Sequence, residues 1–276
     1  MRSLESLIES DRAASEVVGY VLVLGISVGL SFALFVGFIA GTGGTGGPDP
    51  VDQATGQMGV LHGDLIDVVQ QSSYRETTMQ LFNTSVRYSP KPVNITVTGE
   101  WPVDTFRYQV FIRPIVMDVE PSSDNEEVAI KYSAGLISYQ SGPDETALRQ
   151  GPEFTSTDKR TLFVIPAVRQ GGGSSQVSLP DTGRVRATSE RVNSEFITRF
   201  GADGAGNTAT IDGQIVIENV TDAGAWERSL EQKAGFTNVT SSDMANGYER
   251  VTADFASTQL YVRTGYISVS LSTEGV

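Results

Sequence analysis

Residues 17–40 read VVGYVLVLGISVGLSFALFVGFIA, a run of 24 positions without a charged side chain. As an α-helix rising about 1.5 Å per residue, this run would extend roughly 36 Å, enough to cross a hydrocarbon layer of ~30 Å. A removable signal peptide has a shorter apolar region, of roughly 7–15 residues, after a basic start. The segment preceding this run is instead acidic on balance. We therefore predict a retained hydrophobic transmembrane helix over residues 14–40.

The basic residues that flank the run predict its orientation. Arg2 and Arg12 precede it, whereas the first basic residue after it is Arg75. Cytoplasmic flanks of membrane helices are enriched in Lys and Arg, so we expect a cytoplasmic N-terminus. The predicted location is the cell membrane, crossed once, with the C-terminal part of the chain outside the cell.

Small residues recur at every fourth position of the run, at Gly25, Gly29, Ala33 and Gly37. Small residues at this spacing lie on one helix face and allow a second helix to approach closely. We predict a helix-packing face there. The alternative interpretation is that membrane helices contain more glycine than soluble helices do.

The residues just before the run resemble a known N-terminus. The stretch DRAASEVVGY, starting at Asp11 and leading into the apolar run, resembles the start of archaeal type IV pilin-like proteins, in particular haloarchaeal surface proteins. The resemblance implies a charged leader that a prepilin peptidase removes on the cytoplasmic side. It implies that Arg12 is the basic residue of the motif, that the bond between Ala13 and Ala14 is cut, and that Glu16 becomes the third mature residue. A cut after Ala14 fits almost as well.

Two departures from the family pattern shape the expected role. Many archaeal pilins have a Ser-Pro pair at the start of the mature helix, but here Ser15 is followed by Glu16. The chain is also much longer than a compact major pilin. The resemblance therefore implies either a minor filament subunit or a membrane-anchored relative that does not polymerise.

The composition excludes several classes of function. The chain has 33 acidic and 20 basic side chains and a net charge of −13, which argues against nucleic acid as a partner. Only four basic residues are lysine, a halophile-like balance, although an ordinary acidic extracellular protein is the alternative. The chain has no cysteine and one histidine, which excludes thiolate chemistry and multi-histidine metal sites. We expect no enzymatic activity and no cofactor.

A hinge and an amphipathic helix follow the membrane segment. Residues 41–50, GTGGTGGPDP, form a Gly- and Pro-rich linker. Its Gly-x-Gly-x-x-Gly string lacks the preceding β-strand that a dinucleotide-binding motif requires. From Asp52 to Gln71, apolar residues recur at spacings of three and four, which predicts a helix. We interpret His62, within this helix, as a surface residue.

Beyond Tyr74 the apolar pattern changes to the period of two that β-strands show. Turn-forming Pro, Gly, Ser and Asp clusters separate the alternating segments, which favours an antiparallel β-sandwich-like domain over residues 51–276. One composite domain is our first interpretation and two sandwiches our second. Trp226 and Leu230, after Thr221-Asp222, predict one short capped helix. Strands are predicted at 93–98, 105–112, 127–132, 136–139, 162–168, 176–179, 183–188, 209–220, 248–255 and 259–271.

Candidate modification and metal sites lie in this exported part. Asn-x-Ser/Thr triplets, the acceptor motif for N-linked glycans, begin at Asn83, Asn94, Asn219 and Asn238. The acidic stretch Glu120–Glu127 and the turn Asp203–Asn207 contain the oxygen ligands that calcium prefers, but neither has the spacing of a known calcium loop. We interpret both as solvated loops and predict no metal site.

Together these patterns predict a pilin-like, membrane-anchored cell-surface protein with a structural or adhesive role, organised as a leader (1–13), a membrane helix (14–40), a linker (41–50) and a β-rich extracellular domain. Its expected partners are membrane lipid, a prepilin peptidase, and further copies of itself or other pilin-like subunits. The first alternative is an anchored extracellular binding module that does not polymerise. The second alternative is an anchored hydrolase or sensor, which a convergent carboxylate pocket in the β-domain would favour.

Overall fold

Most of the described chain is β-structure, and its strands pair chiefly antiparallel. The computed structural model describes residues 49–276, except 72, 121–126, 143–144, 180–182 and 275–276. Contacts group Pro50–Val276 into one compact unit. The mainly-β class with antiparallel sheets is therefore confirmed.

The first described element is the helix α2 (Pro50–Gln70), which confirms the amphipathic helix predicted from Asp52 to Gln71. Proline is favoured in the first helical turn because it lacks the N–H that would otherwise remain unpaired there. Met58, Leu61 and Leu65 are fully buried, as the spacing of three and four requires. The helix thus presents one apolar face to the β-sheets.

Two arginines from the sheet bind the C-terminal carbonyl groups of α2. Arg263 Nη2 donates to Val69 O (3.1 Å) and Gln70 O (2.6 Å), and Arg191 Nη1 donates to Val68 O (3.3 Å). The last carbonyls of a helix lack partners within it and carry partial negative charge. These bonds hold the end of α2 against strands that lie more than 120 residues away in the chain.

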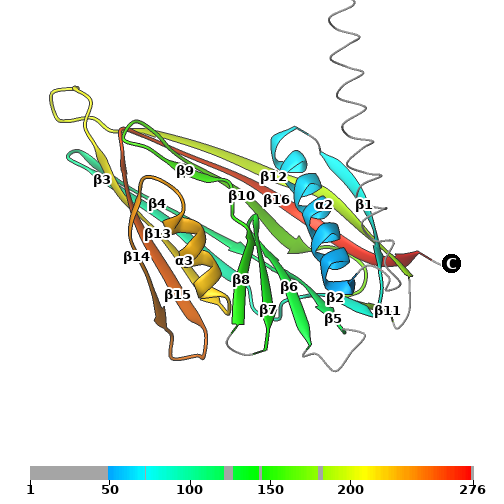
Figure 1. The fold of residues 1–276 in the computed structure, drawn as a ribbon. Coiled ribbons are helices and arrows are strands. Elements are labelled where there is room, and N and C mark those ends of the chain that lie inside the picture. The colour runs from blue at the N-terminus through cyan, green and yellow to red at the C-terminus, as the bar shows by residue number, and fades with distance from the viewer. Residues whose placement is uncertain (1–48, 72, 121–126, 143–144, 180–182, 275–276) are drawn as a thin grey trace, which may run out of the picture. The chain divides into compact units, whose positions relative to one another are not determined.

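The strands of the described residues form three sheets, named A, B and C here (Figure 1). Sheet A has the order β1 (Tyr74–Leu81), β12 (Gly183–Phe200), β16 (Gln259–Glu274), β10 (Thr161–Gln170) and β9 (Phe154–Ser156). Sheet B has the order β11 (Gln176–Leu179), β2 (Thr84–Tyr88), β5 (Ile115–Val119), β6 (Val128–Ser133), β7 (Leu136–Ser141) and β8 (Glu145–Gln150). Sheet C has the order β14 (Phe236–Asp243), β15 (Glu249–Ser257), β13 (Ile211–Val220), β3 (Val93–Trp101) and β4 (Asp104–Ile112).

Sheets A and C pack against each other through aromatic side chains. The ring of Phe163 on β10 meets those of Phe236 on β14 and Phe255 on β15, at centroid distances of 6.0 and 5.4 Å. Nearby, the hydroxyl groups of Tyr108 on β4 and Tyr266 on β16 lie 3.2 Å apart. Aromatic pairs in tilted or edge-to-face geometry stabilise a core beyond the area that they bury.

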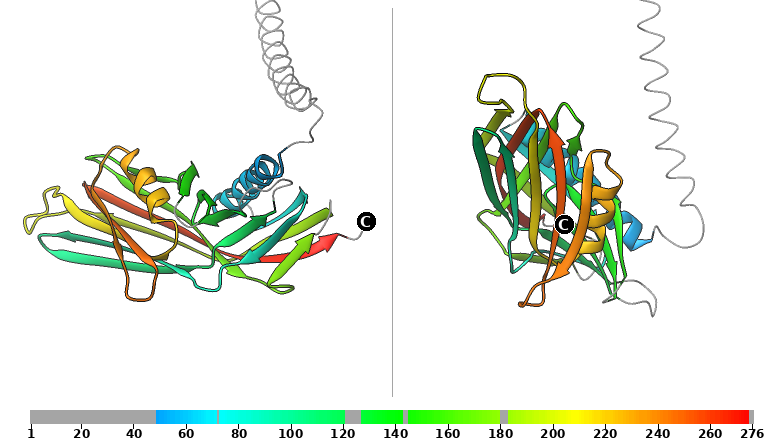
Figure 2. Two further views of the ribbon diagram at one scale, coloured as in Figure 1. Left: turned by 60° about the horizontal axis from the view of Figure 1, so that its bottom comes forward. Right: turned by 90° about the vertical axis from the view of Figure 1, so that its left-hand side faces the viewer.

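The helices lie on one side of the long strands, as the left view of Figure 2 shows. Helix α2 contacts β1, β12, β16 and β10 of sheet A and β5 and β6 of sheet B. The second described helix, α3 (Ala223–Glu231), contacts β8 of sheet B and β14 and β15 of sheet C. Each helix therefore joins two sheets, and the apolar core is continuous between them.

The short helix predicted after Thr221-Asp222 is confirmed, but its cap is not. Asp222 occupies the N-cap position of α3, yet its side chain makes no capping hydrogen bond. Its two carboxylate oxygens instead bind Lys131 and Ser138 of sheet B. The prediction that the Asp222 side chain caps the helix was therefore wrong. The buried Lys131 ammonium group takes a carboxylate oxygen that could otherwise have accepted a bond from the first helical turn.

The predicted strands all overlap observed ones, with three notable differences. The strand predicted at 183–188 continues to Phe200 as β12. The strands β1, β2, β5, β8, β9 and β14 were not predicted as separate segments. Strands β10 and β16 pair in parallel, with Thr161 opposite Leu260, which the antiparallel expectation does not include.

The predicted membrane helix lies outside the described residues. Within the described ranges, neither helix is both long and apolar enough to cross a membrane.

Candidate functional site

Several predicted site residues have no described structure. The leader residues Arg12, Ala13, Ala14 and Glu16 lie outside the described residues. The same holds for the helix-packing residues Gly25, Gly29, Ala33 and Gly37. The candidate functional residues with a described structure therefore lie in the β-rich unit, and the Asn-x-Ser/Thr triplets are among them.

Three of the four triplet asparagines have left-handed backbone conformations. The φ angles are 43° at Asn83, 63° at Asn219 and 50° at Asn238. Asparagine tolerates this region better than other residues with a Cβ, because its short side chain bonds to the nearby backbone. Asn83 lies between β1 and β2, and the other two lie at register shifts in β13 and β14. All three therefore interrupt a strand or connect two strands.

The fourth asparagine, Asn94, is a structural residue inside sheet C. It is 6% exposed, its Nδ2 donates to Glu218 Oε2 (2.9 Å), and its Oδ1 accepts from Gln109 Nε2 (3.0 Å). Glu218 in turn binds Arg250 Nη2 at 2.6 Å. These side chains form a polar row across β4, β3, β13 and β15. A glycan on Asn94 would have to break this row.

The remaining three asparagines differ in how free their side chains are. Asn238 is exposed, and its Nδ2 donates to Asp254 Oδ2 at 2.9 Å. Asn219 is half-buried and accepts a bond from Asn246 Nδ2 at 3.2 Å, and Asn83 is also half-buried. By exposure, Asn238 is the best-placed acceptor of the four.

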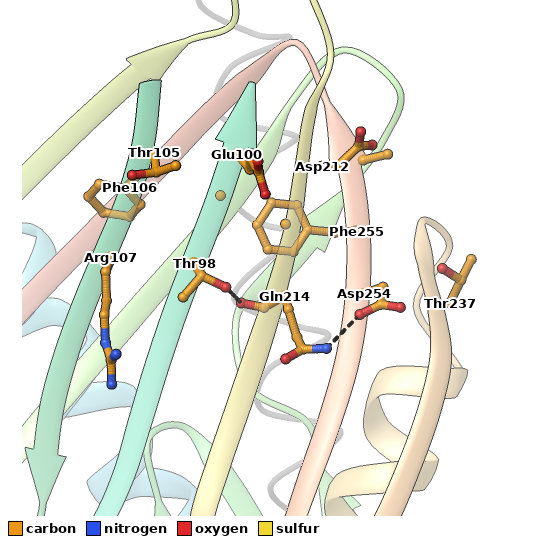
Figure 3. A pocket seen from close by; sticks show the side chains of 13 residues that line it. Thr98, Glu100, Thr105, Phe106, Arg107, Asp212, Gln214, Thr237, Asp254 and Phe255 are labelled. Atoms are coloured by element: carbon orange, nitrogen blue, oxygen red, sulfur yellow. Dashed lines mark hydrogen bonds between the residues drawn. The ribbon is translucent and has the colours of Figure 1, made fainter. Parts of the chain in front are cut away.

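A shallow polar hollow lies on the outer face of sheet C (Figure 3). Asn238 is bonded to Asp254, one of the residues that line it. It has a volume of about 660 Å³. Gln214 Nε2 donates to Asp254 Oδ1 across its floor at 2.9 Å. Side chains from neighbouring strands line it, namely those of Thr98, Glu100, Thr105, Arg107, Asp212 and Thr237.

Two carboxylates of this hollow lie on adjacent strands. Asp212 on β13 and Glu100 on β3 are direct cross-strand partners. Like charges in such positions destabilise a sheet unless solvent or a cation screens them. Both side chains are exposed, so water screens them. The hollow is able to accept a polar ligand, and hydrogen-bonding groups rather than a nucleophile face it.

The turn at Asp203, one of the two candidate calcium loops, uses its carboxylate internally. Asp203 Oδ1 accepts from the backbone N–H groups of Ala205 (2.9 Å) and Asn207 (2.8 Å), and Oδ2 accepts from Asn207 Nδ2 (2.9 Å). These bonds, chiefly that from the Asn207 side chain, lower the pKa of Asp203. In the other candidate loop, residues 121–126 lie outside the described residues. No group of three or more histidine, aspartate or glutamate residues suited to a metal was found where the structure is described.

His62 is buried, which corrects the prediction of a surface residue. It is 6% exposed and lies 5.8 Å, ring to ring, from Tyr132 on β6. Burial lowers the pKa of His62. The prediction was wrong because α2 contacts sheet B as well as sheet A, so its buried face is wider than one sheet would require.

Among the described residues, the most buried ion pair was not predicted from the sequence. Lys131 Nζ on β6 lies 2.8 Å from Asp222 Oδ1 and 3.2 Å from Thr221 Oγ1, and Ser138 Oγ donates to Asp222 Oδ2 at 2.6 Å. The Asp222 side chain is 1% exposed. A lysine within the apolar strand VAIKYS was the available signal, since such a lysine needs a buried carboxylate. Its partner is 91 residues away, so spacing could not identify it.

Comparison with known proteins places the chain in a family. A family model described as "Family of unknown function (DUF7289)" matches residues 12–270. The chain belongs to this family. The family match includes the apolar run, the linker and nearly all of the β-rich unit. No curated protein and no solved structure matches the chain.

Proposed function

We propose that this chain is a membrane-anchored, pilin-like cell-surface protein with a structural or adhesive role, and a minor filament subunit. The observation that carries the proposal is the order of its parts. An uncharged run long enough to span a membrane precedes a Gly- and Pro-rich linker, and α2 follows directly at Pro50. One family model matches across all three parts.

The way α2 is held supports a role in bearing load between an anchor and the β-sheets. Its apolar face is buried against two sheets, and its C-terminal carbonyls are bonded to Arg191 and Arg263. Asp67 and Arg75 form a further ion pair between α2 and β1. A load carried by α2 would therefore be passed to several strands.

The turns at the triplet asparagines fit a surface that faces the medium. We propose glycans at Asn238 first, then at Asn219 and Asn83, and none at Asn94. Acceptors at strand interruptions accommodate a bulky polar group without breaking a ladder of backbone hydrogen bonds, and the exposed Asn238 does so most readily. The Asn94 side chain, by contrast, is bonded on both of its polar atoms.

Mass spectrometry of the protein purified from the membranes of its native host tests the proposal. We expect a mature N-terminus at Ala14, or at Ser15 for the later cut, together with glycopeptides that include Asn238 but not Asn94. The matched control is a variant with Arg12→Glu, which removes the basic residue of the cleavage motif and should retain Met1. A wild-type protein that retains Met1 would contradict processing by a prepilin peptidase.

A second candidate function, an anchored binding module, is favoured by the hollow of sheet C. Its lining of carboxylate, amide, hydroxyl and guanidinium groups suits a polar solute or a hydroxyl-rich envelope polymer. Deletion of the gene separates the two proposals. Loss of a surface filament in electron micrographs supports the structural role, whereas unchanged filaments with loss of binding to envelope material supports the module.

A further inference from the structure

An apolar stripe is exposed on one face of sheet A, beyond the end of α2. Phe196 and Phe200 on β12 are 65% and 59% exposed, and both rings contact Tyr261 on the neighbouring β16, at centroid distances of 6.2 and 6.4 Å. Val192, nearer to β1, is also exposed. Exposed aromatic side chains grouped in this way are typical of interaction surfaces.

The same part of β12 is an unpaired sheet edge. β12 pairs with β16 along its whole length, but β1 pairs with β12 only as far as Glu190. Strand residues alternate in the direction of their backbone groups, and Gly201 N–H donates to Thr258 O, toward β16. The backbone groups that point away from β16 are therefore those of Ser194, Phe196, Thr198 and Phe200. In Figure 1 this part of β12 borders the outline of the unit.

Local side chains occupy part of this edge in the free chain. Asn193 Oδ1 accepts from Ser194 N–H at 2.8 Å, and Arg199 Nη1 donates to Thr198 O at 2.9 Å. Buried or half-buried backbone groups require partners, and side chains supply them where a strand is missing. A further strand would replace both contacts with a regular ladder.

We propose that a second copy of this chain pairs with this edge, β12 against β12, in antiparallel orientation with Ile197 at the twofold axis. In this register Glu195 of each copy lies opposite Arg199 of the other, which places two opposite-charge pairs on one face. Phe196 lies opposite Thr198, and Phe200 lies opposite Ser194. The aromatic stripes of both copies then meet on the other face, since diagonal neighbours across strands are within reach of aromatic rings.

Charge complementarity favours a second copy over the chain's own apolar run. Residues 17–40 contain no charged side chain, so they offer nothing to Glu195 or Arg199. In the free chain the Arg199 guanidinium lies over the Phe106 ring, and Glu195 Oε2 accepts a hydrogen bond from Tyr266 Oη at 3.5 Å. An antiparallel β12 pair adds an opposite charge across from each of these groups, using the same sequence twice, as a twofold interface requires. The inference depends on this strand alone and goes beyond the proposed membrane function.

The ends of the edge limit the assembly to a pair. A register shift between Arg191 and Asn193 interrupts β12 at one end, and the strand ends at Phe200 at the other. Bulges end strand pairing and are a common protection of sheet edges against open-ended association. The paired segment therefore spans residues 194–200, and a symmetric pair leaves this edge filled in both copies.

Cysteine cross-linking of the full-length chain tests the proposal, because the natural sequence has no cysteine. In the proposed register, Ile197 of one copy lies directly opposite Ile197 of the other copy, in a non-hydrogen-bonded pair. The two Cα atoms are then about 4.5 Å apart, which is within the range for a disulfide. We expect Ile197→Cys to form a disulfide dimer on mild oxidation, in detergent micelles and in membranes. Val60→Cys, on the exposed face of α2, is the matched control and should remain monomeric.

A mixture of two variants tests the register. Glu195→Cys and Arg199→Cys, carrying tags of different size, should cross-link to each other far more than either does to itself. Equivalent Glu195 residues of the two copies are separated by roughly 13 Å along the strand, which is too far for a disulfide. Equal self- and cross-linking in this mixture would overturn the register.

Charge reversal tests whether the pairing is specific. In the Ile197→Cys chain, Glu195→Arg should reduce the dimer to the level of the Val60→Cys control, and adding Arg199→Glu should restore it. An Ile197→Cys chain that cross-links no more than the control overturns the proposal.

Discussion

The two halves of β12 belong to one strand but have different surroundings. In the first half, residues 183–190, Val185, Ala187 and Ser189 are fully buried between β1, β16 and α2. In the second half, residues 191–200, every side chain is at least partly exposed, including those of Phe196 and Phe200. The boundary between the halves is the residue at which pairing with β1 stops.

This comparison shows that coverage, rather than hydrophobicity, decides which part of the strand belongs to the core. The larger apolar side chains are in the uncovered half. Helix α2 ends near the boundary, where Arg191 and Arg263 bind its last carbonyl groups. An exposed large apolar patch on a β-edge is informative about partners, whereas a buried one is informative about stability.

The largest expected effect is in the covered half. Leu65→Ala on α2 removes a fully buried side chain from the core between the sheets, and such truncations cost about 2–5 kcal/mol of unfolding free energy. Urea titration of the full chain in detergent micelles measures it, through the fluorescence of the buried Trp101 and Trp226. Val60→Ala, on the exposed face of the same helix, should change the unfolding free energy by no more than about 0.5 kcal/mol. Equal losses in the two variants would show that α2 is not docked.

A methyl group at Gly265 probes the same contact from the sheet side. A Cβ at this position of β16 would lie 2.7 Å from Val69 Cγ2 and 3.1 Å from Val69 Cα, so α2 would have to move. We expect Gly265→Ala to cost about 1–3 kcal/mol in the same titration, as overpacked cores do. Gly172→Ala, where a Cβ would meet no atom within 4 Å, is the control. No difference between these two variants would contradict the close approach of α2 to β16.

The pH dependence of stability reports on His62, the one histidine of the chain, which is buried between α2 and strand β6. Burial holds the pKa of His62 below its usual 6.5 in the folded state. Below pH 6.5 the unfolded chain therefore binds a proton that the folded chain does not, and stability falls as the pH decreases. Well above pH 6.5 His62 is neutral in both the folded and the unfolded chain, so it no longer makes the unfolding free energy depend on pH.

The variant His62→Leu isolates this contribution. Between pH 7.5 and 5, its unfolding free energy should fall less than that of the wild type, because the carboxylates titrate in both chains and only the histidine differs. Chemical denaturation at a series of pH values measures the difference. Parallel curves for the two chains would place His62 in solvent.

The smallest effect on stability is expected in the uncovered half. Phe196→Ser replaces a side chain that is 65% exposed, so the unfolding free energy should change by no more than about 0.5 kcal/mol. The same substitution should nevertheless abolish cross-linking through Ile197→Cys, because it removes apolar area from the proposed interface. A loss of stability comparable to that of Leu65→Ala would mean that the aromatic stripe belongs to the core of a single copy.

Elements with a strong local pattern could be predicted from the sequence, and those without one could not. Helix α2 and the strand β3 have clear periods of 3.6 and 2, and both were predicted close to their observed positions. The sequences FTNVTSSD of β14 and IVMDV of β5 do not alternate regularly between apolar and polar residues. The second half of β12 was missed for the same reason as β14.

The candidate sites also divide into features that a local sequence pattern predicts and features that depend on distant residues. The Asn-x-Ser/Thr triplets are visible in the sequence, but the triplet does not distinguish the exposed Asn238 from Asn94, which is bonded to Glu218 and Gln109. The ion pair of Lys131 and Asp222 joins strand β6 of sheet B to the N-cap residue of α3. A pattern within a few residues contains no information about either partnership.

The sequence by itself determined the mainly-β class, the amphipathic helix ahead of the sheets and the uncharged run of 24 residues, because periodicity and hydrophobicity are properties of neighbouring residues. The tertiary structure alone decided that Asn94 and His62 are buried, that Asp222 neutralises Lys131 and that β12 has an open edge. These features depend on which strands pair and on how far α2 extends across the sheets. Such contacts join residues far apart in the chain, and no local pattern specifies them.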